Sequence, residues 1–171
     1  MMRWGLLPHY AKDVKLAYST FNARADGIET KPAFRDPWKR GHRCLVVTDG
    51  FYEWRKYDKQ PFAVCVKDDL TIMAGLWSTW WSPAGEKVPT CTIITTDANE
   101  AVAQLHDRMP VILPDETWPA WLGETPATAD ELRAMLKPLP DGMLDIWPVD
   151  KRVGNVKNEG ADLAVPITLS T

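Results

Sequence analysis

Residues 43–54 read RCLVVTDGFYEW, and this run of β-branched and aromatic residues is the first of four that decide the fold. The other three runs are QPFAVCVKDD (60–69), LTIMAGLW (70–77) and PTCTIITTDA (89–98). Short apolar runs bounded by Asp, Gly or Pro are typical of β-strands. We therefore expect mostly antiparallel strands, with a tight hairpin turn in DDL after the second run and a looser one in SPAGEK after the third.

Three further segments have the features of short helices. Residues 97–106 begin with an acidic residue and carry apolar residues at helical spacing. Residues 115–123 and 128–139 also resemble short capped helices, and Thr128 stands three residues before Glu131, as in a capping box. Strands followed by a few short helices, joined by proline-rich connections, favour a compact α+β fold.

The composition excludes several classes of protein. The chain has 171 residues, of which 45% are hydrophobic and 25% are charged, values that exclude a disordered chain, a collagen-like repeat and a disulfide-framework peptide. No run of about 18 apolar residues is present, and the N-terminus has no apolar signal-peptide core. We therefore predict one domain over residues 1–171, with one core, in the cytoplasm.

Three cysteines, Cys44, Cys65 and Cys91, each stand inside an apolar stretch. Their spacing forms neither a CxxC motif nor a Cys/His ligand pattern, so buried, inert thiols are the favoured interpretation. No metal site and no cofactor is predicted.

Charge and aromatic content leave nucleic-acid binding open. The net charge is −3, but residues 1–56 carry 11 basic and 6 acidic residues, whereas residues 57–171 carry 9 and 17. A basic first third can present a positive face to nucleic acid, although ordinary solvated surface would show the same counts. The nine tryptophans are expected mostly to anchor the core and the loops, while a few exposed ones would be able to stack bases.

Two residues are candidates for acid/base chemistry. Glu53 stands between two aromatic residues at the end of an apolar run, where loss of solvation would raise the pKa of its carboxyl group. His106 follows a helical segment and precedes Asp107 and Arg108, so it is a candidate proton-transfer group oriented by its neighbours. The alternatives are an edge-strand glutamate that points to water and a structural histidine.

Asn22 and Arg24 are candidates for binding a polar substrate. They stand two residues apart in an extended segment, so their side chains would share one face. An amide there would position a reactant beside a guanidinium that grips phosphate. The remaining histidines, His9 and His42, have no comparable sequence context.

Seven ordered motifs nearly span the chain, and together they resemble one family closely, the SRAP domain or SOS response-associated peptidase family. Seven motifs in order are far more specific than any one short pattern. The motifs are RWGLLP (3–8), NARAD followed by KPAF (22–26 and 31–34), RCLVVTDGFYEWR (43–55), AGLW (74–77), TIITTDAN (92–99), HDRMPVIL (106–113) and VGNVKNEG (153–160).

The resemblance implies an α+β fold with a mostly antiparallel, barrel-like mixed sheet, and a sensor of abasic sites in single-stranded DNA that acts in the DNA damage response. Family members use a cysteine made N-terminal by removal of the initiator Met; its amine and thiolate trap the sugar aldehyde as a thiazolidine, a DNA–protein crosslink. Asn22 is similar to the asparagine that positions this cysteine. Glu53 resembles the carboxylate that assists proton transfer and Met removal, a peptidase-type hydrolysis, and His106 resembles the histidine that helps to open the sugar ring.

The resemblance also implies residues that hold DNA. Arg24 and Arg108 match basic residues that grip phosphates, and Tyr10 and Thr95 match positions that line the DNA channel. Binding would then depend on salt and be largely indifferent to sequence, and the protein would be associated with the nucleoid.

One departure from the family changes what is expected of this chain. Family members begin Met-Cys-Gly-Arg and continue for several dozen residues before the segment that resembles MRWGLLP, whereas this sequence begins at that segment. We therefore expect an N-terminally incomplete SRAP-like domain without the crosslinking cysteine, whether through a start assigned too late, a truncation or a true inactive variant. The other functions left open are a noncovalent module for single-stranded DNA and, less strongly, a peptidase or hydrolase that uses Glu53 and His106.

Overall fold

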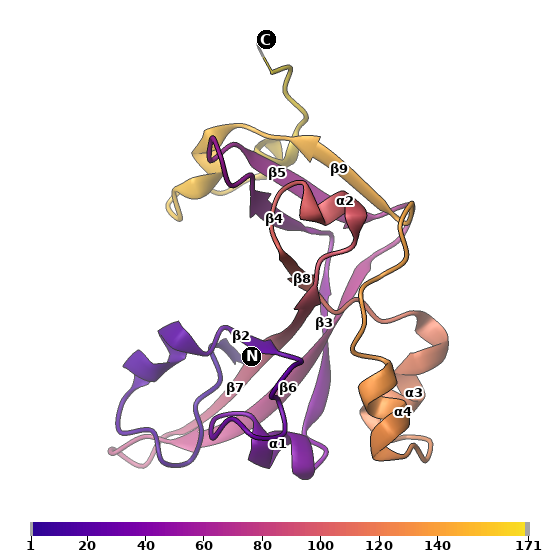
Figure 1. Cartoon of the computed structure of the whole chain (residues 1–171). Coiled ribbons are helices and arrows are strands. Elements are labelled where there is room, and N and C mark those ends of the chain that lie inside the picture. The colour runs from indigo at the N-terminus through magenta and orange to yellow at the C-terminus, as the bar shows by residue number, and fades with distance from the viewer. Residues whose placement is uncertain (1, 170–171) are drawn as a thin grey trace. The chain divides into compact units, whose positions relative to one another are not determined.

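The computed structural model describes residues 2–169 (Figure 1). The chain divides into two compact units, and it passes between them several times. Unit 1 consists of Met1–Val46, Ile72–Thr96 and Pro110–Pro138, and unit 2 consists of Val47–Thr71, Asp97–Met109 and Leu139–Thr171. The single domain expected over residues 1–171 stays a prediction.

Unit 1 is built on a mixed sheet around the long strands β6 (Thr71–Trp81) and β7 (Lys87–Asp97), which pair antiparallel. Ser82 N donates to Glu86 O at 2.9 Å in their connection, so the looser hairpin predicted there is confirmed. On its other side, β7 pairs in parallel with β1 (Arg3–Trp4) and β2 (Asn22–Arg24), and β3 (Arg43–Thr48) lies next to β6.

Short helices complete unit 1, and its core gathers around one tryptophan. Trp121 is fully buried and its ring lies 6.2 Å from that of Trp38, in a cluster with apolar residues of β2, β6 and β7. The helices are η1 (Val14–Ser19), α1 (Arg35–Lys39), η2 (Asp115–Thr117), α3 (Trp118–Leu122) and α4 (Ala129–Ala134). Thr128 and Glu131 exchange hydrogen bonds at the start of α4, which confirms the predicted capping box.

The segment RWGLLP needs a glycine at position 5 because of its backbone conformation and its close contact with Ala17. Its φ of 103° is a backbone conformation that residues with a side chain rarely adopt. A Cβ atom at Gly5 would lie 2.6 Å from Ala17 O and 2.7 Å from Ala17 Cβ, well inside van der Waals contact. This glycine therefore lets η1 pack directly against the segment that follows β1.

Unit 2 contains a three-stranded antiparallel sheet in the order β4 (Phe51–Trp54), β5 (Pro61–Val66) and β9 (Leu144–Pro148). The tight hairpin predicted after residue 67 is wrong, because β5 pairs with β4 and β9, whereas β6 belongs to the other sheet. The first run divides into two strands, β3 and β4, with Gly50 between them. A Cβ atom at Gly50 would lie 2.6 Å from Val64 O, so only glycine fits at this position.

Other short elements of unit 2 frame its loops. The helix predicted over residues 97–106 is confined to α2 (Glu100–Ala103), which ends before β8 (Arg108–Pro110), a strand that pairs with β7. Two 3-10 turns, η3 (Lys151–Gly154) and η4 (Ala161–Ala164), follow β9. The expected fold class, α+β with a mostly antiparallel, mixed and curled sheet and a few short helices, is confirmed. Within residues 2–169, no helix has the length and apolar character needed to cross a membrane.

Candidate functional site

Strand β2 presents Asn22 and Arg24 on one exposed face. Ala23, which stands between them, is fully buried in the unit 1 core. Side chains alternate along a strand, so the structure places Asn22 and Arg24 on the same side, as their spacing predicts.

Thr95 lies directly across from Arg24 on β7. It is the register partner of Arg24, and Ala25 N donates to Thr95 O at 2.8 Å. The guanidinium of Arg24 holds the Asp26 carboxylate through two hydrogen bonds, of 3.1 and 2.7 Å. Asn22 and Arg24 therefore form an exposed polar patch on unit 1, in which Asp26 is already paired with the guanidinium of Arg24, whereas Thr95 beside it is buried.

Tyr10 lies on a separate loop of unit 1. Its side chain is 48% exposed, and its ring meets that of His9 edge to face at 5.5 Å. Ala11 N donates to Pro8 O at 3.0 Å, which closes the turn that carries both rings. Tyr10 is therefore accessible to a ligand, and its predicted place in a DNA channel stays a prediction.

Glu53 lies in β4 of unit 2 and is half-buried. Its register partner on β5 is Phe62, and its Oε1 atom accepts a hydrogen bond of 3.1 Å from Trp54 N. The Glu53 carboxylate thus lies at the main chain of Trp54, at a strand position opposite Phe62.

His106 is oriented by the backbone of Arg108. Arg108 N donates to His106 Nδ1 at 3.2 Å, and a backbone N–H can only donate. Nδ1 also lies 3.4 Å from Arg108 O, but its contact with Arg108 N is shorter, so we assign the proton of the neutral ring to Nε2. The sequence predicted orientation by neighbours, and the structure identifies the neighbour as a main-chain group.

Asp107 does not orient His106 but forms an ion pair. Its carboxylate forms an ion pair with Lys56, which follows β4. The hydrogen bond from Lys56, together with its positive charge, lowers the pKa of the Asp107 carboxyl group. This ion pair ties the segment after Glu53 to the loop that carries His106.

Asn99 holds the segment before His106 in place. Neither Asn99 nor Lys56 was predicted from the sequence. Asn99 is 7% exposed; its Oδ1 accepts from Val102 N at 3.0 Å and its Nδ2 donates to Leu139 O at 3.0 Å. Such an Asn cap starts α2 one turn before His106. The motif TIITTDAN carried this signal, since Asn is a favoured cap residue.

Arg108 stands in β8 with its side chain 18% exposed. Its Nη1 atom lies 3.1 Å from Asp97 Oδ1, whereas the Asp97 side chain is 87% exposed. A phosphate bound at Arg108 would therefore replace a solvated carboxylate as its partner. Glu53, His106 and Arg108 belong to unit 2, whereas Asn22, Arg24, Thr95 and Tyr10 belong to unit 1.

The three cysteines are free thiols and are half-buried rather than fully buried. Burial raises the pKa of all three, and it raises that of Cys44 to about 12, with the neighbouring Cys91 as a smaller cause. The expectation of inert thiols thus has a physical basis in this environment.

Cys44 is expected to react with iodoacetamide at pH 8 about 30-fold more slowly than an ordinary thiol. A pKa raised from 9.0 to about 12 lowers the thiolate fraction about 1,000-fold, and the greater nucleophilicity of a more basic thiolate recovers only part of this. Mass spectrometry of tryptic peptides measures the rate, with the chain unfolded in guanidinium as the control. Equal rates in the folded and unfolded chain would contradict the prediction.

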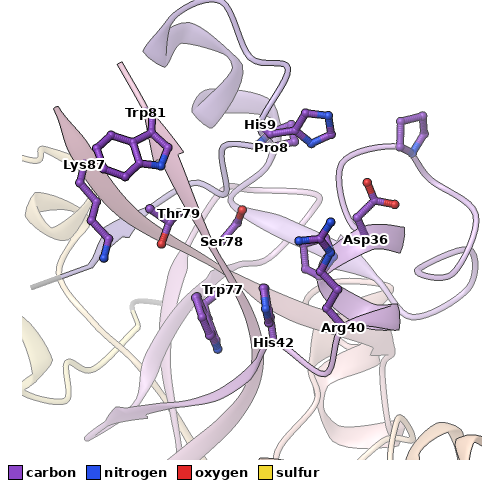
Figure 2. Close-up of a pocket in the computed structure, with 12 residues that line it drawn as sticks. Pro8, His9, Asp36, Arg40, His42, Trp77, Ser78, Thr79, Trp81 and Lys87 are labelled. Atoms are coloured by element: carbon purple, nitrogen blue, oxygen red, sulfur yellow. The ribbon is translucent and has the colours of Figure 1, made fainter. Parts of the chain in front are cut away.

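The structure gives His42 a context that the sequence did not reveal. Its imidazole lies parallel to the indole of Trp77, with ring centroids 4.2 Å apart and an angle of 12° between the planes. Both rings line a cavity of about 430 Å³ on unit 1 (Figure 2). Residues 42 and 77 meet only because β3 lies beside β6, and no local sequence pattern signals that.

Comparisons with known proteins agree with the seven motifs. The abasic site processing protein YoqW of Bacillus subtilis is 40% identical over 166 residues, which cover 95% of this chain and 74% of YoqW. The abasic site processing protein HMCES of Gallus gallus is 34% identical, over 98% of this chain and 57% of its own length. A crystal structure of a Bacteroides thetaiotaomicron protein superimposes with a TM-score of 0.88 at 31% identity, covering 98% of this chain and 76% of that protein.

A family model described as SOS response associated peptidase (SRAP) matches residues 1–156, which is most of the chain. The match and the fold lead to the same conclusion. This chain belongs to the SRAP family.

Proposed function

We propose that this chain recognises abasic sites in single-stranded DNA and acts on them through Glu53 and His106. The observation that carries the proposal is the orientation of His106, whose Nδ1 accepts from Arg108 N and whose Nε2 is left to hold a proton. An N–H group there can donate a hydrogen bond to the ring oxygen of an abasic deoxyribose and stabilise the charge that forms on it as the ring opens; the C1 hydroxyl gives its proton to solvent, and the ring oxygen takes one in return. The relatives named abasic site processing proteins support this choice of substrate.

The exposed patch of Asn22 and Arg24 supports binding of the DNA strand. A guanidinium on an exposed strand face meets phosphate oxygens without reading the base sequence. Arg108 adds a second guanidinium, on unit 2. Binding would then weaken with rising salt, because each phosphate contact releases counterions from the DNA.

A covalent step needs an amine and a thiol on the same residue. The amine nitrogen attacks the aldehyde carbon, water leaves to give an imine, and the thiolate sulfur then adds to the imine carbon to close a five-membered ring. Cys44, Cys65 and Cys91 lie within β3, β5 and β7, so their own nitrogens are peptide nitrogens. We therefore propose binding without a crosslink for the printed sequence, and a crosslink for a version extended to a Met-Cys start.

A denaturing gel tests this proposal directly. The printed chain and the extended version are each incubated with a single-stranded oligonucleotide that carries one abasic site, with an undamaged oligonucleotide as the control. We expect a shifted band that resists denaturant from the extended version alone. A band from the printed chain would mean that another amine reacts, and a band from neither would favour a noncovalent binder.

A further inference from the structure

None of the predicted site residues lines the cavity on unit 1 that contains His42 and Trp77. It lies between the end of α1 and the paired strands β6 and β7 (Figure 2). Its volume of about 430 Å³ is within the range of small-molecule sites. The side chains that give it chemical character are His9, Arg40, His42, Trp77, Trp81 and Lys87.

Strand alternation places two indoles on the cavity side of β6. Trp80 faces the other way and is 3% exposed, with its Nε1 atom donating to Ala11 O at 2.8 Å. Trp77, Thr79 and Trp81 stand at alternate positions and all line the cavity, as does Ser78 between them. Trp81 is 61% exposed, which is a large apolar area to leave in water unless something covers it.

Two cations border these rings. Arg40 stands beside His42, whose ring stacks on Trp77, and Lys87 is the register partner of Trp81 (Figure 2). In the described part of the chain, no carboxylate forms an ion pair with Arg40 or Lys87, and the nearby Asp36 is paired with Arg35. The cavity therefore offers flat aromatic surface, two cations in Arg40 and Lys87, and one carboxylate, Asp36, which already has Arg35 as an ion-pair partner.

His42 contributes a ring rather than a charge. Burial lowers the pKa of its imidazole, and the charge of Arg40 lowers it further. At neutral pH the stack of His42 and Trp77 is thus an uncharged aromatic surface, and the positive charge of the cavity belongs to Arg40 and Lys87.

We propose that this cavity, hereafter the aromatic groove, binds a nucleotide, with its base against the indole of Trp81 or Trp77 and its phosphate between Arg40 and Lys87. Phosphate alone would leave the rings uncovered, and an uncharged aromatic ligand would leave the cations unused. Stacking on an aromatic face tolerates any base, because every base has a π-face. The proposal is independent of abasic-site processing, since the groove shares no residue with that site.

Calorimetric titration of the whole chain tests the groove. The probes are deoxyadenosine monophosphate, deoxyadenosine, inorganic phosphate and a short undamaged oligodeoxyadenylate. We expect the monophosphate to bind more tightly than either of its two parts. Trp81→Ala should weaken binding at least about tenfold, Trp81→Phe should weaken it less, and Arg40→Gln with Lys87→Gln should reduce its salt dependence. Lys39→Gln is the matched control, because Lys39 is an exposed cation of the same helix outside the groove.

The outcomes distinguish a nucleotide of a strand from a free nucleotide, and they decide whether the proposal stands. If the oligonucleotide binds more tightly than the monophosphate and is weakened by the same variants, the groove holds a nucleotide of a strand; the reverse order identifies a free nucleotide. The proposal is overturned if neither ligand binds, or if Trp81→Ala and the double variant bind as the unchanged chain does. Because every probe lacks an abasic site, a failure here leaves the function proposed for Glu53 and His106 standing.

Discussion

Glu53→Gln and His106→Ala are expected to slow covalent capture of an abasic oligonucleotide by about 100-fold or more, in the version extended to a Met-Cys start. Each change removes a group proposed to transfer protons and leaves Arg24 and Arg108 in place. Binding of the same strand should therefore change by less than about threefold. Single-turnover gels give the rate, and fluorescence anisotropy with a labelled strand gives the affinity.

Arg24→Ala and Arg108→Ala provide the contrasting pair for that experiment. Both should weaken binding and lower its salt dependence by about one counterion each, with a smaller effect on the rate at saturating DNA. Arg152→Ala is the matched control, since Arg152 is an exposed arginine of unit 2 that is already paired with Asp162. If the arginine variants slowed the bound complex while Glu53→Gln only weakened binding, the roles assigned to the two groups would be exchanged.

The strands and the capping box could be predicted because their causes are local. Alternating apolar residues specify a strand, and Thr128 with Glu131 specifies a helix start within four residues. The predicted tight hairpin failed because pairing depends on distant partners. β5 forms hydrogen bonds with β9, about 80 residues further on, and no property of the intervening turn reveals that choice.

The sequence indicates only part of the candidate site, for a similar reason. Asn22, Arg24, Glu53 and His106 stand in short motifs whose residue types point to chemistry, so the sequence indicates them. Lys56 becomes relevant only through its ion pair with Asp107. The stack of His42 on Trp77 depends on β3 lying beside β6. Contacts that the tertiary fold creates between ordinary residues leave no mark on either segment alone.

Trp121→Ala is expected to lower the free energy of unfolding by about 3–5 kcal/mol, a large part of the roughly 5–15 kcal/mol that stabilises a typical domain. Trp121 is fully buried in the unit 1 core, and its Nε1 atom donates to Cys44 O at 3.0 Å. Alanine would leave a cavity beside Trp38 and a buried carbonyl without its donor. Urea unfolding followed by circular dichroism measures the loss.

Two further variants separate the causes of that loss. Trp121→Phe keeps a six-membered ring but removes the pyrrole part of the indole together with its Nε1 donor, so it should cost about 1–3 kcal/mol. Trp81→Ala makes the same chemical change as Trp121→Ala at a position that is 61% exposed, so it should cost less than about 1 kcal/mol. Similar losses at positions 81 and 121 would show that burial does not set the cost. The expected difference would mean that Trp81→Ala tests ligand binding in the aromatic groove on a folded chain.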